Sequence, residues 1–180
     1  MRSENSKRWD RWRESTPLRL NGGSDTQMHR HATALALHLM SFDWNHFLTL
    51  TAKTSVSSDA MFRALQRYQR HLTRIVQRSV PYFWAVERDR VNGTAVHAHA
   101  LIAGTQGTPI AVLRGSWQHG YTDAAVYDAT RFGALYAAKD LSLDADNYDI
   151  SAAPPPRRPD WQPETDAAIL ERLTGQRRSG

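Results

Sequence analysis

A strand pattern near the middle of the chain constrains the fold more than any other feature. In the stretch VHAHALI, histidines alternate with small apolar residues, so His97 and His99 project from one face of a strand. The other face is wholly apolar and consists of Val96, Ala98, Ala100 and Ile102. An apolar face must pack on a core, and a slip of one residue would bury the histidines instead. This face therefore fixes the register of the strand.

A second strand, residues 81–90, precedes this one and is joined to it around Asn92-Gly93, a dipeptide that favours a hairpin because both residues accept positive φ. The core positions of the second strand are Trp84 and Val86. A strict two-residue turn would then pair Glu87 with a residue of the apolar face. The pattern instead predicts a three-residue loop with Gly93 in the left-handed region, a G1 bulge, and Glu87 opposite His97.

This register predicts a metal site. Two imidazoles on one strand face have Cα atoms about 7 Å apart, and their nitrogens can converge on one ion at about 2.1 Å. With the Glu87 carboxylate added, His97 and His99 form a set with open positions that suits Mn²⁺, Mg²⁺ or Zn²⁺. The alternative interpretation is a pair of surface histidines without function.

The remaining pattern predicts an α+β fold, with a central antiparallel sheet of about five strands and flanking helices, a palm of the RNA-recognition type. The further expected elements are a helix over Thr26–Met40, a strand over Asn45–Ala52, a helix over 59–78 capped by Ser57 or Ser58, a short helix over Ile110–Gln118, a strand within His119–Tyr127 and a helix over Ala129–Leu141. Residues 1–25 are expected to form a flexible basic arm, 26–150 the folded domain, and 151–180 a Pro-rich linker with a short terminal helix.

Charge is distributed unevenly along a chain whose net charge is +5. Residues 1–20 hold six Lys/Arg against three acids and residues 59–90 hold seven against three, whereas residues 91–150 hold three against six. A basic half beside an acidic half indicates a polyanion-binding face, and an unevenly charged solvated surface is the alternative. The absence of cysteine excludes thiolate zinc sites and cysteine nucleophiles. No apolar run is long enough for a membrane span, and the chain is expected to be cytoplasmic.

The expected helix ATRFGALYAAKDL carries Tyr136 and Lys139 on one stripe. A phenol has a pKa near 10, so it attacks phosphorus only with help, which a metal on the phosphate supplies. Lys139 would be a compact cation beside it. The alternatives are a core aromatic and a solvated lysine.

With these parts assembled, residues 40–145 resemble the HUH endonucleases, and among them the rolling-circle replication initiators. Three segments appear in the order of that family: Phe47-Leu48-Thr49-Leu50-Thr51, His97-Ala98-His99-Ala100-Leu101 and Tyr136-Ala137-Ala138-Lys139. The stretch WQHG, residues 117–120, before a strand is also similar to bacterial and phage members.

The resemblance implies that Tyr136 attacks a DNA phosphate and becomes linked to the 5′ side of the nick, with Mn²⁺ or Mg²⁺ as the cofactor. It implies single-stranded DNA as the substrate, at an origin or hairpin, and a host or separately encoded helicase as a partner. Candidate DNA contacts are Thr49, Thr51, Lys53, Arg63, Arg67, Arg70 and Arg74, with Trp9, Trp12 and Trp44 as candidate stacking residues. The alternatives are a single-tyrosine transposase, a non-catalytic single-strand-binding module, and a metal-dependent hydrolase that uses water.

Overall fold

The computed structural model describes residues 26–88, 95–129, 133–138, 147–165 and 168. Its centre is a five-stranded sheet in the order β4-β1-β3-β2-β5, in which each neighbouring pair is antiparallel. The strands are β1 (His46–Val56), β2 (Tyr82–Arg88), β3 (Ala95–Ile102), β4 (Gly120–Val126) and β5 (Tyr148–Ile150). The predicted α+β fold is confirmed.

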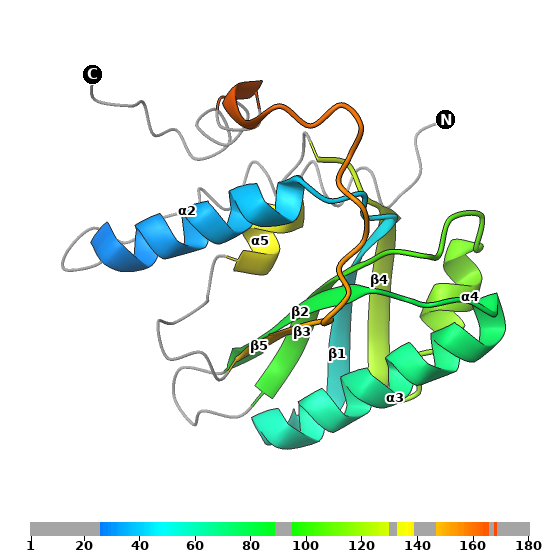
Figure 1. The fold of residues 1–180 in the computed structure, drawn as a ribbon. Helices are drawn as coiled ribbons and strands as arrows, with labels where there is room; N and C mark the ends of the chain where they lie inside the picture. The colour runs from blue at the N-terminus through cyan, green and yellow to red at the C-terminus, as the bar shows by residue number, and fades with distance from the viewer. Residues whose placement is uncertain (1–25, 89–94, 130–132, 139–146, 166–167, 169–180) are drawn as a thin grey trace, which may run out of the picture.

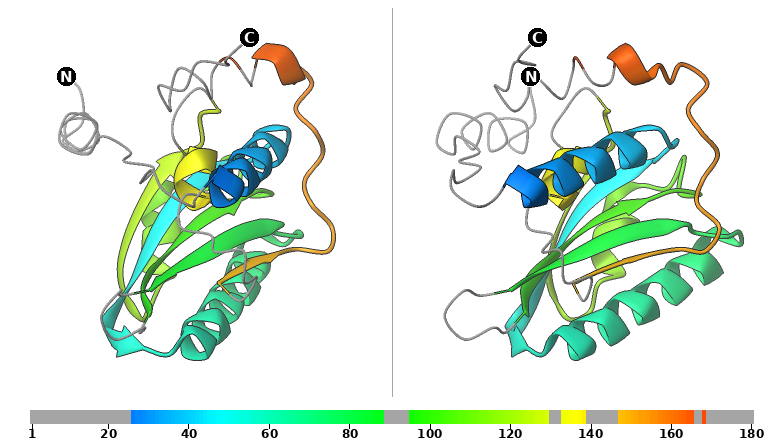
Figure 2. Two further views of the ribbon diagram at one scale, coloured as in Figure 1. Left: turned by 90° about the vertical axis from the view of Figure 1, so that its left-hand side faces the viewer. Right: turned by 60° about the vertical axis from the view of Figure 1, so that its left-hand side comes forward.

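Helices cover both faces of this sheet (Figure 1). They are α2 (Thr26–Met40), α3 (Ser58–Val76), α4 (Ile110–Gly115) and α5 (Gly133–Ala138). The helices α2 and α5 lie side by side on one face, and α3 and α4 pack on the other (Figure 2). We refer to the face under α2 and α5 as the site face and to the face under α3 and α4 as the far face.

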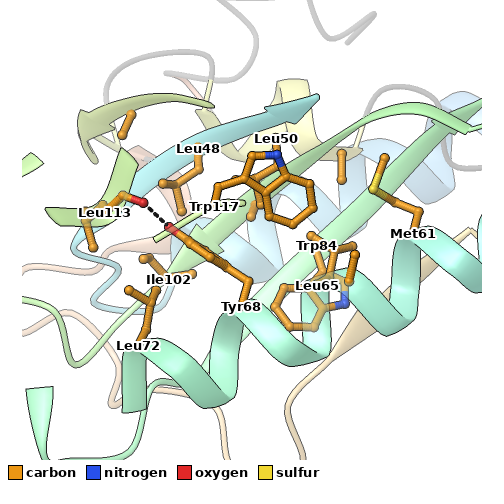
Figure 3. Close-up of a cluster of buried hydrophobic side chains, with 14 of the residues drawn as sticks. Leu48, Leu50, Met61, Leu65, Tyr68, Leu72, Trp84, Ile102, Leu113 and Trp117 are labelled. Carbon is orange, nitrogen blue, oxygen red and sulfur yellow. Dashed lines mark hydrogen bonds between the residues drawn. The ribbon is translucent and has the colours of Figure 1, made fainter. Parts of the chain in front are cut away.

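The far face holds the larger core (Figure 3). It forms because α3 is amphipathic, with its apolar stripe buried and its arginines exposed. The buried members from α3 are Met61, Ala64, Leu65, Tyr68 and Leu72. The Tyr68 hydroxyl satisfies its buried proton by donating to the Leu113 carbonyl oxygen at 2.9 Å. This hydrogen bond ties α3 to α4, and burial raises the pKa of Tyr68.

The site face holds a second core beneath α2 and α5. Small residues of α5 allow close approach to the sheet, where they meet the alternate positions of β1, β2 and β3. The buried members include Ala134, Ala137 and Ala138 of α5 and Phe47, Phe83 and Leu101 of the sheet. Both sheet faces are therefore buried over the Leu101 end of β3, and the site face is less covered toward His97, which is half-buried.

The strand register is the one that the apolar pattern predicted. Trp84 pairs with Ala100, Val86 with Ala98 and Glu87 with His97. The register then shifts, because Arg88 pairs with Ala95 and β3 has one extra residue at this point. The bulge in the described residues therefore lies beside the histidines, while the predicted turn at Asn92-Gly93 lies outside them.

The other elements agree with expectation in kind. Ser57 caps α3, with its Oγ accepting from the Ala60 N–H at 3.2 Å. The short strand β5 was not read from the sequence. The Pro-rich segment after β5 runs back along residues 41–43, through hydrogen bonds between Asp43 N–H and Pro156 O and between Arg158 N–H and Ser41 O, both 2.9 Å. The arm over 1–25 and most of the terminal helix lie outside the described residues.

Gly120 lies where β4 begins against β1, and a Cβ there would overlap the Thr51 carbonyl oxygen and approach the Ala52 and Lys53 backbone to 2.9 Å. We expect Gly120→Ala to lower the free energy of unfolding by about 1–3 kcal/mol, because the two strands must separate. The matched control is Gly115→Ala, whose Cβ meets nothing within 4 Å. Urea unfolding measures both, and equal midpoints for the two variants would contradict the expectation.

His46 is 5% exposed, and its Nδ1 lies 2.8 Å from the Thr105 hydroxyl oxygen. Burial lowers the pKa of His46 below its ordinary value of 6.5. Its contribution to stability is therefore fully present above pH 6.5 and is lost as the pH falls toward the lowered folded-state pKa. We expect the free energy of unfolding to fall less between neutral pH and about pH 5 in His46→Asn than in the wild type, measured by urea unfolding. Equal losses would show that His46 does not titrate on unfolding.

Candidate metal centre

Side chains from four strands form a row across the site face. Cross-strand pairing places Tyr121 of β4 beside Thr51 of β1, Thr51 beside His97 of β3, and His97 beside Glu87 of β2. Directly paired residues of antiparallel strands project from the same face. In the next row, Thr49 pairs with His99. The sequence-predicted residues Thr49 and Thr51 therefore flank the two histidines.

Glu87, His97 and His99, which we name the candidate centre, converge on one point. The His97 Nε2 lies 2.7 Å and the His99 Nε2 3.3 Å from the same Glu87 oxygen, Oε2. The two imidazole rings meet edge to face, with centroids 4.8 Å apart. All three potential ligand atoms lie within 4.8 Å of one another.

The surroundings of His99 fix its ring. His99 is 3% exposed, whereas the side chains of His97 and Glu87 are 23% and 29% exposed. The Thr49 hydroxyl lies 3.3 Å from His99 Nδ1, so the other ring nitrogen is directed at Glu87. Phe47 stacks on the same ring, with centroids 6.0 Å apart and planes at 10°. One deep ligand and two accessible ones leave the candidate centre open on its outer side.

The residues present fit a divalent ion. Both Nε2 atoms point to a common carboxylate oxygen, and a hydroxyl contacts the far nitrogen of the buried histidine, as partners of metal-bound histidines do. Imidazole and carboxylate donors bind Mn²⁺ and Zn²⁺ well, and a single carboxylate is also compatible with Mg²⁺. The candidate centre could therefore hold a metal ion, and its donors alone do not select which.

The helix α5 lies on the same face as the candidate centre. Its first residue, Gly133, is packed so closely that a Cβ there would approach the Tyr127 ring at 3.1 Å and the Phe47 ring at 3.6 Å. Phe47 in turn stacks on His99, so a single ring separates the start of α5 from the buried histidine. The backbone of Tyr136 belongs to α5. Its side chain, and all of Lys139, lie outside the described residues.

Other predicted residues lie elsewhere. The α3 arginines, Arg63, Arg67, Arg70 and Arg74, are exposed on a helix that covers the far face. The structure therefore does not bring them together with the candidate centre. Lys53 is exposed on β1 beyond Thr51. Trp44 is 3% exposed and donates its Nε1 proton to the Leu39 carbonyl oxygen at 2.7 Å, so the expectation that it stacks on bases was wrong.

Sequence reasoning missed the residues that hold the site strand in place. The Trp117 Nε1 donates to the Thr51 carbonyl oxygen at 3.0 Å, and the Gly120 backbone abuts the same carbonyl. Both belong to the WQHG stretch, which was noticed only as a likeness. Its spacing, a tryptophan three residues before a glycine at a strand start, was the available signal. The stacking of Phe47 on His99 had no comparable signal, because it depends on the strand pairing.

An antiparallel sheet with an open two-histidine, one-glutamate cluster on one face, and a tyrosine-bearing helix packed on that face, defines an α+β domain with a candidate metal centre. A family model, that of the replication-associated protein ORF2 and its relatives, matches residues 45–143, more than half of the chain. The protein belongs to this replication-associated family, and membership supports a role in DNA replication. No curated protein and no solved structure matches the chain. Among the described residues, no helix is long and apolar enough to cross a membrane.

Proposed function

We propose that the protein is a metal-dependent, single-tyrosine DNA endonuclease and strand transferase of the HUH type that initiates rolling-circle replication. The observation that carries the proposal is the placement of the Tyr136 helix and the convergent candidate centre on one face of the sheet. Membership of the replication-associated family supports DNA as the substrate.

In the proposed reaction, the Tyr136 oxygen loses its proton and bonds to the phosphorus of a DNA phosphodiester. The bond from phosphorus to the 3′ oxygen breaks, and that oxygen leaves as a hydroxyl after taking a proton. The 5′ end stays linked to tyrosine, which conserves the energy of the broken bond for rejoining, so no nucleotide cofactor is consumed. A bound Mn²⁺ or Mg²⁺ would polarise the phosphate and offset the charge that develops on it.

The residues around the candidate centre have defined parts in this proposal. Glu87, His97 and His99 hold the ion, and Thr49 orients His99 through the contact at its Nδ1. Thr51 lies beside His97 and offers a hydroxyl to the DNA backbone. Lys139 is proposed as a cation for the phosphate or the tyrosine oxygen.

The α3 arginines have a separate part. Because α3 covers the far face, its exposed arginines cannot contact the phosphate held at the candidate centre. We propose that they contact the backbone of DNA outside the cleaved segment, which gives affinity without sequence selection. The partner helicase and the origin or hairpin substrate are further parts of the proposal that the family supports only in outline.

An adduct assay tests the proposal. Labelled single-stranded DNA is incubated with the full chain in Mn²⁺, in Mg²⁺ and with a chelator, and the products are separated under denaturing conditions. A covalent protein–DNA adduct that needs the metal supports the tyrosine nuclease. Cleavage without an adduct would instead indicate a hydrolase that uses water, and binding without cleavage would indicate a single-strand-binding module.

A further inference from the structure

Tyr121 is an aromatic side chain that the site face leaves uncovered. It is 83% exposed, the most of any large apolar side chain within the described ranges. It is the second residue of β4, the edge strand of the sheet (Figure 1). Its pairing with Thr51 places it in the same row and on the same face as His97 and Glu87.

The neighbours of Tyr121 suit a polyanionic ligand. Lys53 follows Thr51 by two positions and is exposed, and its N–H donates to the His119 carbonyl oxygen at 2.8 Å, so β1 and β4 stay joined there. Alternation directs Lys53 to the same face as Thr51. The nearby Asp123 is not a free negative charge, because its Oδ1 lies 2.8 Å from an Arg114 guanidinium nitrogen.

The chemistry of this surface selects a planar, negatively linked ligand. An exposed phenol ring offers a flat apolar face, and stacking of bases on aromatic side chains is a principal contact of single-stranded nucleic acid with sheet surfaces. A neighbouring ammonium pairs with phosphate. Among the described residues, the site face offers no other large aromatic side chain with this exposure.

We propose that Tyr121 is a stacking platform for a nucleobase of the single-stranded DNA near the scissile phosphate, with Lys53 contacting the adjoining backbone. The inference rests on the proposed function for the identity of the ligand. Neighbouring strands lie about 4.8 Å apart, so the Tyr121 and His97 Cα atoms, two strands apart, are separated by about 10 Å. That distance spans about three nucleotides of a stacked strand and fewer of an extended one. Tyr121 therefore positions the DNA and does not take part in bond breaking.

Binding without cleavage tests the inference. The full chain carrying Tyr136→Phe is titrated in a chelator against a short fluorescent mixed-sequence single-stranded DNA, with anisotropy as the readout. We expect Tyr121→Ala to weaken binding about tenfold and Tyr121→Phe to bind within about twofold of the parent, because stacking needs the ring and not the hydroxyl. The matched control is Val126→Ala, an exposed apolar residue at the other end of β4, which should bind as the parent does.

A second measurement locates the stacked base. Single abasic sites are placed in turn along the oligonucleotide, and one position should weaken binding in the parent but not in Tyr121→Ala. Tyr121→Ala binding as tightly as the parent, or Tyr121→Phe as weakly as Tyr121→Ala, would overturn the inference. A parent that does not bind single-stranded DNA would overturn it as well.

Failure of the proposed function gives a different result. If the wild type forms no covalent adduct in Mn²⁺ but Tyr121→Ala still weakens binding, the stacking role stands and the nuclease does not. If the adduct forms and Tyr121→Ala changes neither affinity nor the KM of cleavage, the nuclease stands and the stacking role is wrong. Thermal unfolding of each variant checks that the fold is retained.

Discussion

Replacing Tyr136 with phenylalanine is expected to abolish the covalent protein–DNA adduct and to lower the nicking rate by at least about a thousandfold. The substitution removes one oxygen atom and keeps the ring, so the helix and its packing should be unchanged. The loss follows because no other group would form the bond to phosphorus. Denaturing electrophoresis with labelled single-stranded DNA measures the adduct, and mass spectrometry of the proteolysed adduct identifies the linked residue.

A second phenol on the site face gives this prediction its control. Tyr148 of β5 pairs with Ala85 in the row that contains His99, and its ring packs on Phe83 with centroids 5.9 Å apart. Tyr148→Phe should leave the adduct intact. An adduct that survives in Tyr136→Phe and disappears in Tyr148→Phe would move the nucleophile to β5 and refute the assignment to α5.

Removing a ligand of the candidate centre is expected to weaken Mn²⁺ binding at least about a hundredfold. Loss of a partner that only orients a ligand costs about 10–100-fold in metal affinity, and loss of the ligand itself should cost no less. The best variants are His97→Ala and Glu87→Gln, because both side chains are partly exposed and their replacement disturbs the core little. Titration calorimetry measures the affinity without reference to catalysis.

Thermodynamic linkage provides a second readout of the same site. In the wild type, Mn²⁺ at 100 times its Kd should raise the free energy of unfolding by about 2.7 kcal/mol, and the two variants should show little of this gain. His119→Ala, which removes an exposed histidine outside the candidate centre, is the control and should respond as the wild type does. Equal Mn²⁺ affinity in His97→Ala and the wild type would reduce the cluster to a hydrogen-bonded histidine–carboxylate network.

The candidate centre could be predicted from sequence because burial of one face determines strand parity. Ala98 and Ala100 had to face a core, so His97 and His99 had to face away from it. The same requirement on Trp84 and Val86 placed Glu87 opposite His97, and the structure has this pairing. The origin of the register was predicted less well: within the described residues, the parity change comes from a bulge in β3 beside His97.

The sequence by itself determined the helices, four of the five strands and the pairing that gathers Glu87 with the two histidines, because these depend on local periodicity and on one buried face. Only the tertiary structure decided which face each helix covers. An amphipathic helix must bury its apolar stripe, but both faces of this sheet are apolar over much of their area, so the stripe does not select between them. That choice places α5 beside His99 and the α3 arginines on the far face. Tertiary packing also decided that Trp44 is buried and Tyr121 is exposed, since burial depends on which elements cover an aromatic residue.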